Sequence, residues 1–255
     1  MHTHVQAQKR PRRRTRWTLA ALFAAIVAIS LNAGLAGAVP KLMVLGSSQQ
    51  TAEPSCPASP CQAIGKVTGF QTTIGNAKKP FLAPSDGKIV AWSIKTSSPD
   101  EKQKEFFNEF YGGQPSARIS ILKPIPKSPL GYKLRAQSPV EELAPVLGAT
   151  TTFALKTPIT VRAGQVVAIS VPTWAPVFAV GLPKGNSWRS SRAAASCTDT
   201  EKIKAGKAHE EPRSERTYGC SYTTARLLYS ATMVKTATAK KKKPAAPDKP
   251  PAEKP

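Results

Sequence analysis

The central part of the chain is a succession of short apolar runs separated by turn residues, and this pattern constrains the fold more than any other feature. Residues 88–95 follow an Asp-Gly turn pair and place Val90, Trp92 and Ile94 on one face of an extended segment. Such alternation over four to eight residues is typical of a half-buried strand. Proline is also frequent, at 24 of 255 residues, which argues against a mainly helical chain.

Similar runs recur along the region without the alternation of strands and helices that builds parallel sheets. They lie at 117–122, 152–155, 159–161, 165–171, 177–180 and 225–234. In the last run, Leu227, Tyr229, Ala231 and Met233 form the more apolar face, and we expect that face in the core. Eight to ten short strands with turns between them predict a mainly β fold, a single antiparallel, jelly-roll-like β-sandwich over residues 65–234.

One helix of about three turns is expected within this region, lying across an end or edge of the sandwich. Ser98 is a candidate N-cap, a proline follows it at the first helical position, and Glu101 stands three residues after the cap. A pair of glycines ends the pattern. Phe106, Phe107 and Phe110 mark an apolar stripe, which we expect to cover the core. The alternative is that the stripe lines a ligand groove.

The N-terminal part has the pattern of an export signal. Residues 1–16 end in a run of arginines, and residues 17–40 contain no charged residue. Small residues match a cleavage site after Ala38, whereas the charge-free length is also sufficient for a membrane span of ~20 residues. Residues 1–38 are thus a cleaved signal peptide or a retained hydrophobic anchor helix, and a buried core helix is disfavoured by the basic flank. The first two alternatives predict a protein that is secreted, or held by residues 17–38 on the outer face of the cytoplasmic membrane.

Two further segments flank the predicted domain. Residues 39–64 are rich in Ser and Pro and are expected to form an exposed leader. Residues 235–255 are rich in Lys and Pro and are expected to be a disordered tail. The tail contains a contiguous lysine run, Lys240, Lys241, Lys242 and Lys243.

The net charge of the chain is +22, and it limits the classes of partner. Lysine-rich segments bind anionic surfaces, so an anionic envelope polymer or a membrane surface is the expected partner. Nucleic acid is an unlikely partner because it is less accessible outside the cell. The alternative for the tail is a solubilising spacer.

Four cysteines follow the apolar segment, an even number that suits an oxidising compartment. Their proximity in sequence favours two local disulfides, Cys56–Cys61 and Cys197–Cys220. A zinc site is the alternative, but Cys197 and Cys220 are not a close pair of the kind that such sites use.

Catalytic signatures are absent, and the sequence indicates no catalytic residue, metal ligand or cofactor. His209 is the only histidine of the predicted domain, and its charged surroundings favour an ordinary solvated residue. A glycoside hydrolase needs a pair of carboxylates, and no pair is selected by the pattern. The candidate carboxylates for such a pair are Asp86, Glu109, Glu141, Glu142 and Asp199. Asp86 and Asp199 are also candidate calcium ligands, but neither belongs to an acidic cluster.

Two tryptophans and two arginines form the candidate ligand surface. Trp188 stands between Gly-Asn and the basic residues Arg189 and Arg192, and Trp174 precedes it in a Thr-Trp-Ala-Pro turn. Tryptophan faces stack on sugar rings, and arginine donates hydrogen bonds to hydroxyls and acidic groups, so carbohydrate is a candidate ligand. The alternative is that both tryptophans cap the open end of the sandwich while the arginines are solvated.

Over about residues 65–234 the chain resembles a group of uncharacterised exported bacterial proteins. The segments that carry the resemblance are 86–92, 117–122, 171–176, 188–192, 217–220 and 225–229. The resemblance implies one β module and no particular activity. We therefore expect a non-enzymatic, exported binding or structural module of the envelope, with a hydrolase acting on wall or extracellular polysaccharide as the alternative. The sequence does not define an oligomeric state.

Overall fold

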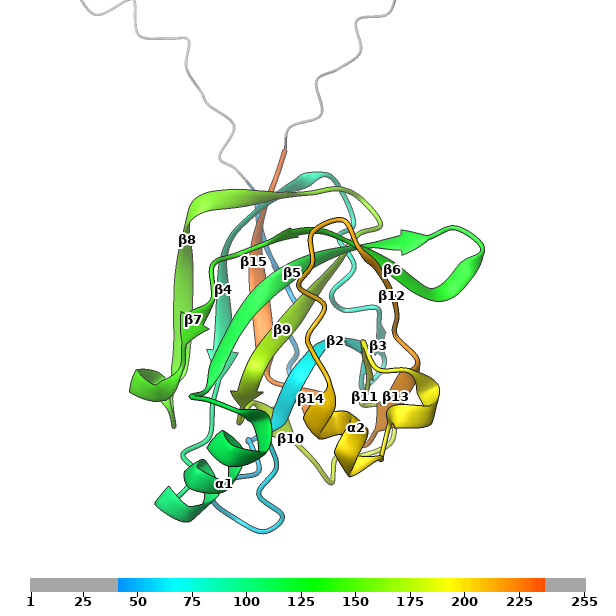
Figure 1. Cartoon of the computed structure of the whole chain (residues 1–255). Coiled ribbons are helices and arrows are strands. Elements are labelled where there is room, and N and C mark those ends of the chain that lie inside the picture. The colour runs from blue at the N-terminus through cyan, green and yellow to red at the C-terminus, as the bar shows by residue number, and fades with distance from the viewer. Residues whose placement is uncertain (1–40, 237–255) are drawn as a thin grey trace, which may run out of the picture. The chain divides into compact units, whose positions relative to one another are not determined.

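A computed structural model describes residues 41–236, which consist mainly of β-strands (Figure 1). The predicted signal or anchor of residues 1–38 lies outside the described residues. Most of the predicted tail, including Lys240–Lys243, also lies outside them. Within the described part of the chain, no helix is long and apolar enough to cross a membrane.

The strands and helices follow one another in an order dominated by strands. The strands are β1 Leu42–Leu45, β2 Ile64–Ile74, β3 Ala77–Lys78, β4 Gly87–Lys95, β5 Ser116–Ile125, β6 Ser128–Gln137, β7 Glu141–Glu142, β8 Thr150–Val161, β9 Val166–Ala175, β10 Phe178–Ala179, β11 Ser187–Ser190, β12 Glu215–Thr217, β13 Cys220–Thr223, β14 Arg226–Leu227 and β15 Tyr229–Lys235. The helices are α1 Glu101–Tyr111, α2 Thr200–Ala205 and the 3-10 turns Ala144–Val146 and Ala194–Ser196. The strands outnumber the eight to ten expected, partly because two-residue strands leave no period in the sequence.

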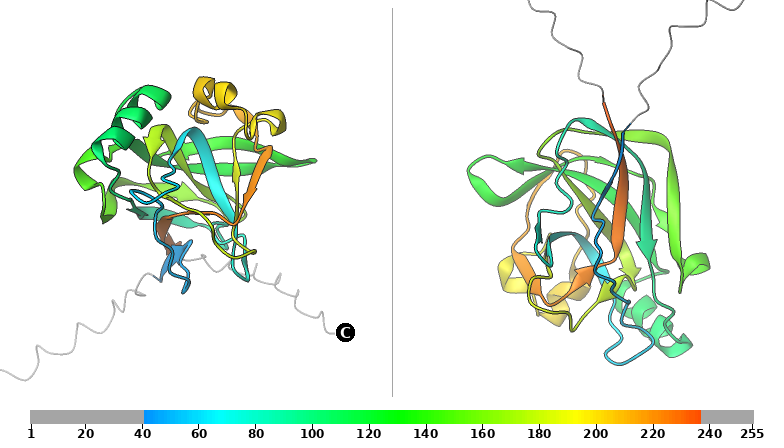
Figure 2. Two further views of the ribbon diagram at one scale, coloured as in Figure 1. Left: turned by 90° about the horizontal axis from the view of Figure 1, so that it is seen from below. Right: turned by 180° about the vertical axis from the view of Figure 1, so that it is seen from behind.

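Two curled antiparallel sheets hold most of these strands (Figures 1 and 2). The smaller sheet has the order β1-β15-β4-β8, and the larger has β12-β6-β5-β9-β2-β11-β13, with β3 beside β2 and β7 beside β5. Strands β10 and β14 form a separate pair. The arrangement is consistent with a β-sandwich-like fold, whereas the jelly-roll connectivity stays a prediction.

The folded region begins before residue 65, where the sequence placed its start. Residues 42–45, within the expected leader, form β1 and pair with β15 so that Leu42 lies opposite Val234. The run Leu-Met-Val-Leu has no polar residue in alternation, so its pattern did not indicate a half-exposed strand. This short edge strand is formed by its pairing with β15, which the residues of β1 alone do not reveal.

Strands β14 and β15 place their side chains as the alternation predicts. Leu227, Tyr229, Ala231 and Met233 are all buried in the core between the sheets. Strand β4 departs from the prediction because a bulge interrupts its register with β8, so that Ile89 rather than Val90 joins the core. A bulge adds one residue and moves the following side chains to the other face.

The central strand β9 is buried on both faces. Val167, Ile169 and Val171 face the core as predicted, but Ser170 on the opposite face is also fully buried. The segment before β12 covers that face, because the His209 amide donates a hydrogen bond to Thr68 Oγ1, and this hydroxyl is bonded to Ser170.

Helix α1 begins two residues later than the sequence predicts. Asp100, not Ser98, is the N-cap, and its carboxylate accepts from the amide of Gln103 while the Gln103 side chain accepts from the Asp100 amide. The stripe is also rotated relative to the prediction: Phe107 is buried, whereas Phe106 is 57% exposed. Gly112 ends the helix in the left-handed region, which glycine adopts without strain.

A basic groove between the two sheets

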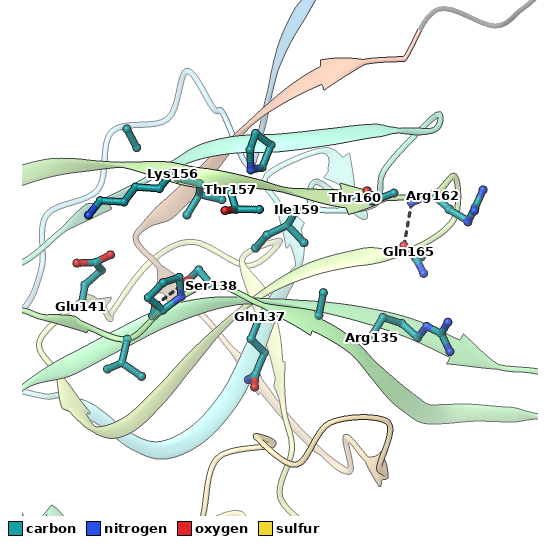
Figure 3. A pocket seen from close by; sticks show the side chains of 16 residues that line it. Arg135, Gln137, Ser138, Glu141, Lys156, Thr157, Ile159, Thr160, Arg162 and Gln165 are labelled. Carbon is teal, nitrogen blue, oxygen red and sulfur yellow. Dashed lines mark hydrogen bonds between the residues drawn. The ribbon is translucent and has the colours of Figure 1, made fainter.

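A groove of about 910 Å³ lies at one side of the sandwich (Figure 3). One wall is the free edge of β8, and the other is the end of β6 with the link into β7. The turn between β8 and β9 closes one end. The residues that line it are 135–141, 154–160, Arg162 and Gln165. Its volume is within the range of about 300–1,000 Å³ that is usual for ligand sites.

A wide bulge in β8 creates the upper wall of the groove. Ala154 pairs with Ala91 and Ile159 pairs with Ile89, so one residue of β4 stands opposite four residues of β8. Pro158 is among these four, and a proline has no amide to contribute to a ladder. The strand therefore bends away from its partner.

Hydrogen bonds fix the β6–β7 wall and the closed end before any ligand binds. Ser138 Oγ accepts from the Ile119 amide at 3.1 Å and donates to the Pro139 carbonyl at 2.8 Å. At the closed end, Gln165 Oε1 accepts from the Arg162 amide at 2.8 Å. Because these groups are already paired, the groove is preformed rather than dependent on a loop that must order.

The charged side chains divide the groove into two ends (Figure 3). Arg135 and Arg162 extend at one end, whereas Lys156 and Glu141 lie at the other. Arg135 and Lys156 form no ion pair with any residue in 41–236. Arg162 approaches Asp86 at 3.4 Å, but both side chains are well exposed, so water screens this pair. The groove thus carries three cations and one carboxylate.

The prediction that Trp174 and Trp188 belong to an exposed ligand surface is wrong. Trp174 is fully buried against α1, where its indole nitrogen donates to Asn108 Oδ1 and to the Gly113 carbonyl, each at 2.9 Å. Trp188 is only 2% exposed and stacks on Tyr222. Neither ring has a face free for a sugar. The two side chains also belong to different hydrophobic clusters, Trp188 to the large core between the sheets and Trp174 to the smaller cluster beside α1.

The two arginines of that surface serve the backbone of neighbouring segments. Arg189 donates to the Tyr218 carbonyl at 3.2 Å, and Arg192 donates to the Gly65 carbonyl at 2.7 Å. Arg192 also donates to the Tyr222 hydroxyl at 3.3 Å. Both are partly buried, so they are less free to bind a ligand than the groove cations.

His209 is fully buried, which corrects the expectation that it is solvated. Its Nδ1 lies 3.2 Å from the Tyr218 hydroxyl, and its Nε2 lies 2.9 Å from Ser214 Oγ. Burial is the main cause that lowers the pKa of His209, and the charge of Arg216 adds to it. The imidazole is therefore held neutral inside a network of hydrogen bonds.

The contact between Ser214 and His209 resembles part of a catalytic dyad, but its hydrogen bonds indicate a structural turn. Ser214 Oγ donates its proton to the Glu211 carbonyl at 2.6 Å. The imidazole Nε2 must then act as the donor to Ser214 Oγ, which leaves no lone pair to activate the serine. Nδ1 accepts from Tyr218, so both ring nitrogens are used in holding the segment.

The buried imidazole makes a pH-dependent stability prediction. Because the pKa of His209 is lowered in the folded state, the unfolded chain binds a proton more readily. The free energy of unfolding should be unaffected by this group above pH 6.5 and fall as the pH drops below that value. Urea denaturation between neutral and mildly acidic pH measures the slope. In His209→Gln the profile should be flatter, and an equal slope in both proteins would contradict the assignment.

Apart from the adjacent Glu141 and Glu142 of β7, the carboxylates considered as catalytic pairs or calcium ligands lie on different elements. Glu109 is on α1, Asp86 precedes β4, and Glu142 is exposed on β7. Asp199 caps α2, where the Lys202 amide lowers the pKa of its carboxyl group. Among residues 41–236 no cluster of three or more His, Cys, Asp or Glu side chains is arranged to hold a metal ion.

Both predicted disulfides are present. Cys56–Cys61 closes a short loop beside α1, and Cys197–Cys220 connects the segment after the second 3-10 turn to β13. No free cysteine remains among the described residues. Two disulfides are consistent with an exported protein, because such bonds persist in oxidising compartments.

No protein-family model, no curated protein and no solved structure matches the chain. The resemblance to exported bacterial proteins stays a prediction. The geometry of the described residues alone must then support a function.

Proposed function

We propose that this protein is an exported, non-enzymatic β-sandwich module that binds an acidic glycan of the cell envelope. The observation that carries the proposal is the preformed groove, which is lined by three cations and one carboxylate and so has an excess of positive charge. A ligand that carries repeated carboxylate or phosphate groups would neutralise this excess.

The two ends of the groove suit different parts of such a ligand. Arg135 and Arg162 present planar guanidinium groups, which pair with carboxylate or phosphate oxygens through two parallel hydrogen bonds. At the other end, Lys156 donates and Glu141 accepts, which suits sugar hydroxyls. The buried Ile159 forms an apolar floor against which a sugar ring can pack.

A hydrolase acting on polysaccharide is less well supported by the same residues. Glycoside hydrolysis needs two carboxyl groups on either side of the bond that breaks. Among the residues that line the groove, Glu141 is the one carboxylate. The arrangement therefore favours binding over cleavage.

Removing the two unpaired cations tests the groove directly. Arg135→Gln/Lys156→Gln should weaken binding of polygalacturonate about tenfold or more, since each charge-assisted hydrogen bond contributes ~1.5–3 kcal/mol before solvent screening. Isothermal titration calorimetry measures the affinity, with neutral dextran as the comparison ligand. The affinity should also fall as salt rises.

A matched control keeps the change in net charge but moves it away from the groove. Lys102→Gln/Lys104→Gln on α1 removes two cations and should leave polygalacturonate affinity unchanged. Equal weakening by both double variants would show that net charge alone binds the polymer. Unchanged binding in the groove variant would reject the groove as the site.

A further inference from the structure

The two chain ends that flank the described region leave from the same end of the smaller sheet. Strands β1 and β15 are antiparallel neighbours, with Leu42 opposite Val234, and the Lys235 amide donates to the Lys41 carbonyl at 3.3 Å. Strand β1 begins where β15 ends, as Figure 1 shows. Lys41 and Lys235, near the two ends of the described region, thus lie side by side.

This end of the sheet carries basic side chains without acidic partners. Lys88 of β4 stands opposite Val234 of β15, Lys235 ends β15, and Lys41 directly precedes β1. None of these three lysines forms an ion pair within residues 41–236. The nearby carboxylate of Asp86 accepts from the Ala163 amide at 2.9 Å and lies 3.4 Å from Arg162.

An apolar edge adjoins these lysines. Leu42 is 63% exposed and Val44 is 45% exposed, although both are large aliphatic side chains. The pairing of Leu42 with Val234 and of Val234 with Lys88 places these residues on one face of the sheet, because directly opposed residues share a face. Aliphatic side chains beside lysines are the combination that inserts at the interface of an anionic bilayer.

A helix with a net negative charge lies at the opposite end of the domain. Helix α1 lies at that end (Figures 1 and 2). From its N-cap onward it carries more acidic than basic residues, namely Asp100, Glu101, Glu105 and Glu109 against Lys102 and Lys104. A negative membrane surface would attract the lysines at one end and repel helix α1 at the other.

We propose that the end formed by Lys41, Leu42, Val44, Lys88 and Lys235 rests against an anionic lipid bilayer, with α1 directed away from it. The sequence on either side fits this orientation: residues 17–40 carry no charge, and Lys240–Lys243 follow β15 closely. The lipid contact is independent of the glycan site.

Photo-crosslinking in nanodiscs tests the orientation. The full chain is reconstituted in phosphatidylcholine with or without phosphatidylglycerol, with benzoylphenylalanine replacing either Val44 or Phe106. These two positions have comparable exposure, at 45% and 57%. We expect lipid adducts at position 44 to exceed those at position 106 severalfold, and only when phosphatidylglycerol is present.

Charge variants separate this proposal from general adhesion. Lys88→Gln/Lys235→Gln should lower the yield at position 44 about fivefold for each lysine, the ratio equivalent to ~1 kcal/mol per charge near an anionic membrane. Lys102→Gln/Lys104→Gln should not lower it. Equal yields at positions 44 and 106, or a yield at 44 that does not depend on phosphatidylglycerol, would overturn the proposal. Polygalacturonate titration without lipid tests the groove separately, so either proposal can fail alone.

Discussion

Trp188→Ala is expected to lower the free energy of unfolding by ~3–5 kcal/mol, the usual cost of truncating a buried tryptophan. The indole stacks on Tyr222 with ring centres 4.5 Å apart and meets the edge of Phe178 at 5.6 Å. It also lies on Gly69, where an added Cβ would stand 2.9 Å from the ring. Because three strands enclose the ring, the site cannot collapse to fill the cavity. Thermal unfolding should shift down by roughly 10 °C, at ~2–4 °C per kcal/mol for a domain of this size.

Two controls show whether the tryptophan acts through packing. Trp188→Phe keeps an aromatic face toward Tyr222 and should cost less than the alanine variant. Leu42→Ala removes an exposed side chain and should change stability by less than ~0.5 kcal/mol. If Trp188→Ala melts like the wild type but no longer binds polygalacturonate, the ring is a ligand contact and its burial in the core is not its role.

Trp188 also shows why local pattern did not locate the core at this point. Its neighbours are Gly, Asn, Ser and Arg, which are typical of a loop, and the strand is only four residues long. It is held by two partners that are distant in sequence, β2 and β13. Hydroxyl groups satisfy the polar positions, as in the Thr72–Ser187 hydrogen bond of 2.6 Å. Nothing in five adjacent residues encodes such partners.

Predictions that rested on short-range pattern were more successful. The face of β15 and the two disulfides depend on spacings of two to a few tens of residues, and the structure confirms both. The prediction for His209 was wrong for the opposite reason. Its charged neighbours indicated solvent exposure, but its amide donates a hydrogen bond to Thr68, 141 residues away in sequence. Burial of a polar segment depends on what covers it, which the segment itself does not encode.

The groove was predictable from the sequence only in part. Pro158 stands between the apolar runs 152–155 and 159–161 and indicates an irregular edge strand, so the upper wall had a signal in the sequence. Arg135 and Lys156 are 21 positions apart, and only the approach of β6 to β8 brings them to one hollow. A cation without a partner is visible only after its surroundings are known.

Loss of the Cys197–Cys220 disulfide should destabilise the protein by about 3 kcal/mol, according to the chain-entropy description of a crosslink that spans 23 positions. The closed loop includes α2 and the segment that places His209 on the larger sheet. Cys197→Ala/Cys220→Ala should therefore also speed hydrogen exchange at the His209 amide, which the intact protein bonds to Thr68. Urea denaturation and amide exchange measure the two effects.

The second disulfide is the matched control for the first. Cys56–Cys61 spans only 5 positions, so the same description gives Cys56→Ala/Cys61→Ala a smaller loss of about 2 kcal/mol. Its loop packs beside Phe107 and Trp174 of the smaller cluster, far along the chain from His209. Exchange at His209 should thus remain slow in this variant under native conditions. Equal losses for both variants, or fast exchange at His209 in both, would show that the long loop is held by packing and hydrogen bonds rather than by its disulfide.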